Sequence, residues 1–237
     1  MSAYEVIRIK LGMVNAYLVK SENQLFLIDT GLAGKRSISR IEAACRQMGS
    51  SIGDLDMILL THTHHDHAGG AAECKARSSA AILLHRAEAE VLKSGISGFP
   101  AGTNDLVRFM VAVAKKLHKG GTPFPPVEAD IELGSDSELN LDDELDLHSY
   151  GFPGVAIPTP SHTAGSLSLL TDRGDCFCGD ILFNIFPGTL YPPVADNPGA
   201  LTSKWRLLLD RGAKLFYPGH GGPIERQRVE RELQRRG

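Results

Sequence analysis

The chain has 237 residues, of which 42% are hydrophobic and 22% charged, and a formal net charge of −3. This composition is typical of a globular protein with a buried core, and the slight acidic excess argues against a general binder of nucleic acid. There is no membrane-length apolar run, no leader-like N-terminus and no dense cysteine framework, so we expect a cytoplasmic protein that does not associate with membranes.

Five short apolar runs predict β-strands that each lead to an aspartate or histidine. They are QLFLIDTG (24–31), DMILLTH (56–62), VAIPTPSH (155–162), DCFCGD (175–180) and KLFYPGH (214–220). Ligands of open α/β sheets gather where strands end, so we expect these polar side chains to converge on one site.

Helical spacing of apolar residues predicts helices between some of these strands. The helical segments are 34–48, 68–77, 104–119, 202–211 and the charged tail 225–237. Together with all-β stretches around 131–149 and 165–178, they predict an α/β architecture. We expect one domain, 1–237, in which residues 93–130 are an insertion with Gly- and Pro-rich flanks.

The segment THTHHDH (61–67) concentrates histidines to a degree that neither a core nor a solvated loop requires. His62 and His64 are two apart at the exit of a strand, so both can point the same way. Asp66 and His67 follow at the entry to a helix. This arrangement suits two adjacent cations, but neither pair completes a shell of four ligands. Distant parts of the chain must supply the rest, and the candidates are His162, Asp180 and His220.

These motifs resemble those of the metallo-β-lactamase-fold superfamily. Residues 62–67 match its His-Xaa-His-Xaa-Asp-His signature. Further similar segments are VNAYLV (14–19), LIDTG (27–31), PTPSHTAGSLSL (158–169), CGDILF (178–183) and YPGHGGPI (217–224). The resemblance therefore spans roughly residues 14–224 and implies a four-layer αββα sandwich of two mixed β-sheets.

The resemblance also implies the roles of the site residues. One metal ion would be held by His62, His64 and His162, and a second by Asp66, His67 and His220. Asp180 would bridge the two, and Asp29 would brace the histidine-bearing loop without binding metal. The imidazole and carboxylate donors suit two Zn²⁺ ions and leave Fe or Mn open.

The implied activity is hydrolysis of a small ester, thioester or lactone, in which a metal-bridging hydroxide attacks the carbonyl and Asp66 handles the proton. Asp180 argues against a true β-lactamase, and Phe183 weakens the lactonase interpretation. GDILF looks more like glyoxalase II and other thioesterases. The alternatives are a phosphodiesterase or nuclease of the same fold, a mononuclear iron persulfide dioxygenase, and a non-catalytic metal-binding module.

A substrate pocket is expected beside the metals. The insertion at 93–130 could cover them with apolar side chains, while residues 184–198 line the other side. The predicted pocket residues are Phe99, Phe109, Met110, Phe124, Phe183 and Tyr191. An equally weighted alternative is that the apolar stripe of 104–119 packs on the body of the protein.

Overall fold

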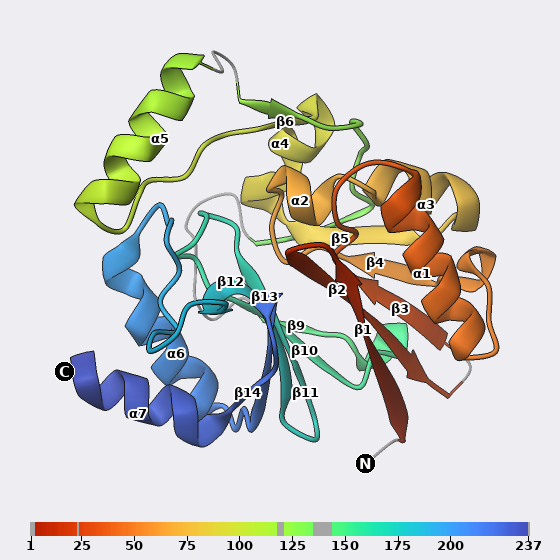
Figure 1. Ribbon diagram of the computed structural model, residues 1–237. Coiled ribbons are helices and arrows are strands. Elements are labelled where there is room, and N and C mark those ends of the chain that lie inside the picture. Colours follow the sequence, from red (N-terminus) through yellow and green to blue (C-terminus); the bar gives the residue numbers. More distant parts are fainter. Residues whose placement is uncertain (1–2, 23, 118–120, 135–143, 237) are drawn as a thin grey trace.

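The computed structural model describes residues 3–22, 24–117, 121–134 and 144–236 (Figure 1). Parts of the predicted segments 104–119, 131–149 and 225–237 lie outside the described residues. Among the described residues, no helix combines the length and apolar character needed to cross a membrane.

The N-terminal half of the sheet grows from a β-hairpin into a parallel arrangement. Its strands are β1 (Tyr4–Leu11), β2 (Val14–Ser21), β3 (Gln24–Ile28), β4 (Met57–Leu59), β5 (Ala81–His85) and β8 (Ile131–Leu133). Pairing from β3 through β4 and β5 to β8 is parallel. The connecting helices are α1 (Lys35–Gln47), α2 (His65–Ala68), α3 (Ala71–Ser78) and α4 (Ala89–Ser94), with the 3₁₀ turns η1 (Ile52–Asp54) and η2 (Arg86–Glu88).

The C-terminal half is mostly antiparallel. Its strands are β9 (Leu145–Asp146), β10 (Gly154–Pro158), β11 (Leu167–Thr171), β12 (Asp175–Asn184), β13 (Leu215–Gly221) and β14 (Ile224–Glu225). It also contains α6 (Leu201–Asp210), α7 (Arg226–Arg236) and the 3₁₀ turns η3 (His148–Tyr150) and η4 (Pro198–Ala200). The two halves are joined where His220 of β13 pairs with Val14 of β2, which makes one mixed sheet of 12 strands within the part of the chain that the structure describes.

Alternating side chains of the strands build the layers, because successive residues point to opposite faces. Leu18 and Leu27 pack with α1 and α3 in one core, whereas Tyr17 and Phe26 face the other half of the sheet. A third core lies between the C-terminal half and α6 and α7 (Figure 1). The predicted αββα layering is confirmed, with the refinement that hydrogen bonds join the two sheets.

The predicted insertion, 93–130, begins in the last turn of α4 and contains β6 (Ile96–Ser97), α5 (Asp105–Leu117) and β7 (Thr122–Pro123). The two short strands pair with each other, apart from the main sheet. Figure 1 shows α5 at the edge of the molecule, away from the helices that cover the sheet. Backbone hydrogen bonds from Thr103 to Pro193 and from Ala195 to Ala101 tie the start of this region to the 193–195 loop.

Candidate metal centre

The histidine-rich segment begins just after β4, at the end of the sheet where β3 and β5 also finish. Thr61, His62 and His64 lie in the extended stretch between β4 and α2, and His67 lies in α2. Successive side chains of this extended segment point to opposite sides, so Thr61 and Thr63 lie on the side opposite to His62 and His64. The segment can therefore present ligands on one side and be anchored from the other.

Asp29 provides one of these anchors. Its Oδ1 accepts from the backbone N–H of Thr61 at 2.9 Å, and its Oδ2 accepts from the Thr61 hydroxyl at 2.8 Å. The same Oδ2 lies 2.8 Å from Nδ1 of His67. Asp29 has a φ of 57°, a left-handed conformation that aspartate tolerates better than most residues and that commonly marks functional positions. It thus braces the histidine loop, in the place that the sequence predicts.

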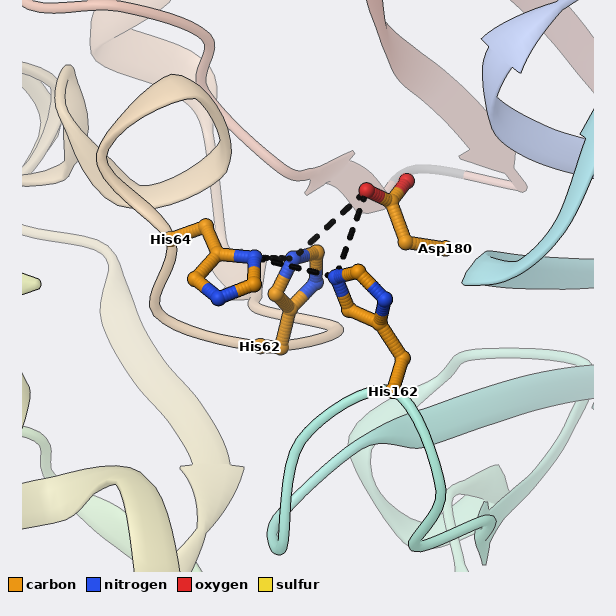
Figure 2. A group of neighbouring side chains, drawn as sticks. All are labelled: His62, His64, His162 and Asp180. Carbon is orange, nitrogen blue, oxygen red and sulfur yellow. Dashed lines mark hydrogen bonds and ion pairs between the residues drawn. The ribbon is translucent and has the colours of Figure 1, made fainter. Parts of the chain in front are cut away.

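The first group of candidate ligands is His62, His64, His162 and Asp180 (Figure 2). Nδ1 of His64 lies 3.0 Å from Nε2 of His62 and 3.0 Å from Nε2 of His162. Oδ2 of Asp180 is 3.5 Å from Nε2 of His162 and 3.9 Å from that of His62. Figure 2 shows these atoms pointing toward one another from three separate segments of the chain.

The second group is Asp66, His67 and His220. Nε2 of His67 and Nε2 of His220 are 3.4 Å apart, and the latter is also 3.4 Å from Oδ2 of Asp66. Asp180 adjoins this group as well, with Oδ1 at 3.3 Å from His67 and Oδ2 at 3.4 Å from His220. The structure therefore brings together all seven predicted ligands, with Asp180 between the two groups.

Outer hydrogen bonds fix which ring nitrogens face the centre. Nδ1 of His162 lies 2.9 Å from the carbonyl of Val194, and Nδ1 of His220 lies 2.9 Å from the carbonyl of Met13. A carbonyl only accepts, so each Nδ1 carries the proton. Nδ1 of His67 likewise donates to Asp29. Their Nε2 atoms are thereby directed at the centre, as in metal-binding histidines.

Asp180 reaches the centre through an irregularity in β12. The pairing of β12 with β13 shifts register on both sides of Gly179, which has a φ of 51°. Such a bulge re-aims the next side chain. The sequence predicts a strand that ends at Asp180, whereas β12 continues to Asn184, and the bulge turns Asp180 toward the centre. Among the described residues, Oδ1 of Asp180 is buried without a hydrogen-bond partner.

The two groups differ in their affinity for protons. Burial lowers the pKa of His62 and His64, and it lowers that of His162 to about 3 against the opposing effect of Asp180. Burial acts in the same direction on His220, but Asp180 and Asp66 outweigh it and raise the pKa to about 9. The pKa of His67 is also raised, chiefly by Asp180 and Asp29.

These features fit divalent cations. Ligand atoms 2.0–2.1 Å from a tetrahedral zinc ion lie roughly 3.3 Å from one another, close to the separations within each group. Ring nitrogens and carboxylate oxygens of both groups converge at short range, and Oδ1 of Asp180 is buried without a hydrogen bond among the described residues. A cation in each group would satisfy them together, so the donor set is compatible with two divalent ions.

A cavity of about 210 Å³ adjoins the first group through His64. Its wall includes Phe99, as the sequence predicts for a pocket residue, together with Glu88 and Asp196. Phe183 is buried and stacks on His220, with ring centroids 4.6 Å apart, so it supports a candidate ligand.

The other predicted pocket residues lie elsewhere. The prediction that Phe124 lines this cavity is wrong: its side chain is buried in the core cluster that includes Leu92 of α4, and its backbone N–H donates to the carbonyl of Gly95. Phe109 and Met110 are 68% and 60% exposed on α5. Tyr191 lines a separate cavity with Val107, and its hydroxyl donates to the carbonyl of Pro198.

Sequence reasoning missed the residues that anchor the loop. Thr61 and Thr63 each direct a hydroxyl and a backbone N–H to a buried carboxylate, of Asp29 and Glu88 respectively. The alternation of threonine with histidine in THTH was the available signal, because two-residue periodicity puts the two types on opposite sides. No sequence signal distinguishes Glu88 from neighbouring glutamates.

Comparisons with known proteins agree with this geometry. The family model described as the metallo-β-lactamase superfamily matches residues 9–220. A relative from Methanocaldococcus jannaschii, named as a probable metallo-hydrolase, is 29% identical over 87% of this chain and 87% of its own length. The hydroxyacylglutathione hydrolase of Aeromonas hydrophila is 26% identical over 74% of this chain, which spans about half (49%) of that protein.

Solved structures show the same fold. A metallo-β-lactamase family protein from Thermus thermophilus superposes with a TM-score of 0.66 at 22% identity, covering 98% of this chain and 79% of that one. An archaeal metallo-β-lactamase superfamily protein from Sulfolobus tokodaii has a TM-score of 0.62 at 22% identity, with coverages of 97% and 85%.

Proposed function

Since this chain belongs to the metallo-β-lactamase superfamily, we propose that it is a hydrolase of small esters, thioesters or lactones that uses two divalent metal ions. The observation that carries the proposal is the double cluster of histidine and carboxylate ligand atoms around Asp180, whose Oδ1 is buried without a hydrogen bond among the described residues. The hydroxyacylglutathione hydrolases among its relatives, by their names, favour a thioester substrate.

In this proposal, His62, His64 and His162 hold one ion, and Asp66, His67 and His220 hold the other, with Asp180 shared between them. Zinc suits the donors, and Fe or Mn would also be accepted. When bound, the two ions would polarise the substrate carbonyl and lower the pKa of a water molecule that serves as nucleophile.

The chain itself supplies position and proton transfer. Asp66 is partly accessible, 3.4 Å from His220, and is the carboxylate that can accept a proton as the nucleophile attacks. The cavity beside His64 offers the aromatic ring of Phe99 and the apolar side chains of Val91 and Pro100 to the acyl or thiol part of the substrate. Its small volume favours a small molecule.

Metal analysis followed by substrate profiling tests the proposal. The purified protein should contain about two divalent ions per chain. It should hydrolyse thioesters, esters or lactones, lose this activity with a chelator and recover it with zinc. Preferential cleavage of bis(p-nitrophenyl) phosphate would contradict it in favour of a phosphodiesterase. One iron per chain with oxygen consumption on persulfides would contradict it in favour of a dioxygenase.

We also propose that α5 acts as a cover for the substrate, since Leu106, Phe109 and Met110 expose an apolar face. Deleting the whole insertion is a poor test because Phe124 belongs to the core. The double variant F109S/M110S changes only the exposed face and should raise KM for long-chain esters at constant stability. An unchanged KM across acyl chain lengths would remove the cover from the proposal.

A further inference from the structure

Glu88 is a buried carboxylate outside the seven candidate ligands, with only 5% of its surface exposed. Its Oε2 accepts from the backbone N–H of Thr63 at 3.0 Å and from the Thr63 hydroxyl. Its Oε1 accepts from the backbone N–H of Gly165 at 3.0 Å. Burying a carboxylate is costly unless its oxygens receive donors, and here each of them does.

The two segments that Glu88 connects carry the histidines of the first group. Thr63 lies between His62 and His64, while Gly165 lies three residues after His162. A backbone bond from Leu167 to Thr61 joins the bases of these segments, and Glu88 joins them nearer their tips.

The fold delivers Glu88 to this position. Strands β4 and β5 are parallel, so their carboxyl ends meet at one edge of the sheet. The histidine segment follows β4, and Glu88 ends the 3₁₀ turn that follows β5. Nδ1 of His85 accepts from the N–H of Ala87 and caps this turn, which gives a structural role to a histidine that is not a candidate ligand.

The absence of a side chain at residue 165 is part of the same arrangement. A Cβ added to Gly165 would lie 2.4 Å from Cγ of Glu88 and 2.9 Å from its Oε1. The carboxylate can approach the backbone N–H of residue 165 only because that residue is glycine.

We propose that Glu88 is a positioning residue that holds the ligands of the first metal group in register and acts on that group alone. Asp29 instead connects the two groups, because it binds Nδ1 of His67 and also Thr61, which precedes His62. The inference rests on the proposed function in so far as both require metal at these ligands. It predicts that the affinities of the two ions can be changed separately.

The variant E88Q tests it with the full chain. A carboxylate offers two acceptor oxygens, whereas the glutamine amide offers one and turns its NH₂ toward the other N–H donor. Titration of the metal-free protein with Co²⁺, followed by its visible absorption, should show a first-group affinity about 10–100-fold weaker. The second-group affinity should change by less than about threefold. E90Q makes the same change at an exposed neighbour and should leave both affinities unchanged.

Variants at Thr63 guard against a misfolded E88Q. T63V removes the hydroxyl donor at nearly constant shape and should weaken the first ion alone, while T63S keeps the hydroxyl and should restore it. Equal weakening of both ions, or of neither, in E88Q or in T63V would overturn the inference. A wild-type protein that binds no Co²⁺ would instead contradict the proposed function, so the two failures are distinct.

Discussion

The first and second metal groups use the same residue types but differ in charge. His62, His64 and His162 share one carboxylate, and burial keeps their pKa low. Asp180 and Asp66 raise the pKa of His220 to about 9, and Asp180 and Asp29 raise that of His67. The comparison teaches that the placement of carboxylates, rather than the number of histidines, decides which group takes up a proton when no cation is present.

Replacing Asp180, the carboxylate shared by the two groups, should have the largest effect on metal binding and hydrolysis. D180N removes the side chain that lies between the groups, so both ions should bind more weakly and hydrolysis should fall by at least about 1000-fold. The loss of a direct ligand exceeds the roughly 10–100-fold cost of losing an outer partner. Metal content and kcat measured together check this, with the exposed D105N as control. Full metal content with full activity would break the view that the groups share Asp180.

The pH dependence of the metal-free protein sharpens the charge difference. The pKa of His220 rises from 6.5 to about 9 on folding. Its contribution to the free energy of unfolding is therefore complete below pH 6.5 and is lost as the pH rises through 9. At 1.36 kcal/mol per unit, this is up to about 3 kcal/mol. The pKa of His162 falls from 6.5 to about 3, so stability is also lost as the pH falls between those values.

The Tm of the chelated protein should therefore decline on both sides of about pH 6.5. In H220Q the decline in Tm above pH 6.5 should become smaller, while the decline in Tm below pH 6.5 should remain. The metal-loaded protein should lack the alkaline decline, because a cation then occupies the place of the proton. A Tm independent of pH between 6.5 and 9 in the chelated wild type would contradict the assignment of charge to the second group.

Loss of the Asp29 carboxylate should give a smaller effect than loss of Asp180. D29N leaves one acceptor oxygen for the Thr61 donors and Nδ1 of His67, so both ions should bind about 10–100-fold more weakly. Metal titration of D29N beside E88Q measures the comparison directly, because E88Q should weaken the first ion alone. A D29N protein that binds both ions with wild-type affinity would contradict the role of Asp29.

The smallest effect is expected at Phe183, which stacks on His220 and is more distant from His162, at 6.5 Å between ring centroids. F183L keeps the apolar volume but loses the aromatic contact, at a cost of about 1 kcal/mol. Thermal unfolding should register this change, and kcat should fall by less than about fivefold. A larger loss with thiols than with alcohols as leaving groups would show that the ring contacts the substrate.

Much of the fold and site could be predicted because local patterns specify them. The alternation of apolar residues predicts the strands, and the spacing in THTHHDH places His62 and His64 on one side. Local patterns do not predict which apolar residues of the insertion are buried. Phe109 and Phe124 are both aromatic residues of the insertion, yet one is 68% exposed and the other buried.

The sequence by itself determined which donors are available, that they follow strands, and that the chain folds into α/β layers. Only the tertiary structure decided that the bulge at Gly179 turns Asp180 toward the centre. It also decided that Glu88 rather than Glu90 joins two ligand segments and that Phe124 belongs to the core. The physical reason is that periodicity fixes the face on which a side chain lies. Its partner depends on parallel strands and loops that are remote in sequence and meet only when the sheet is assembled.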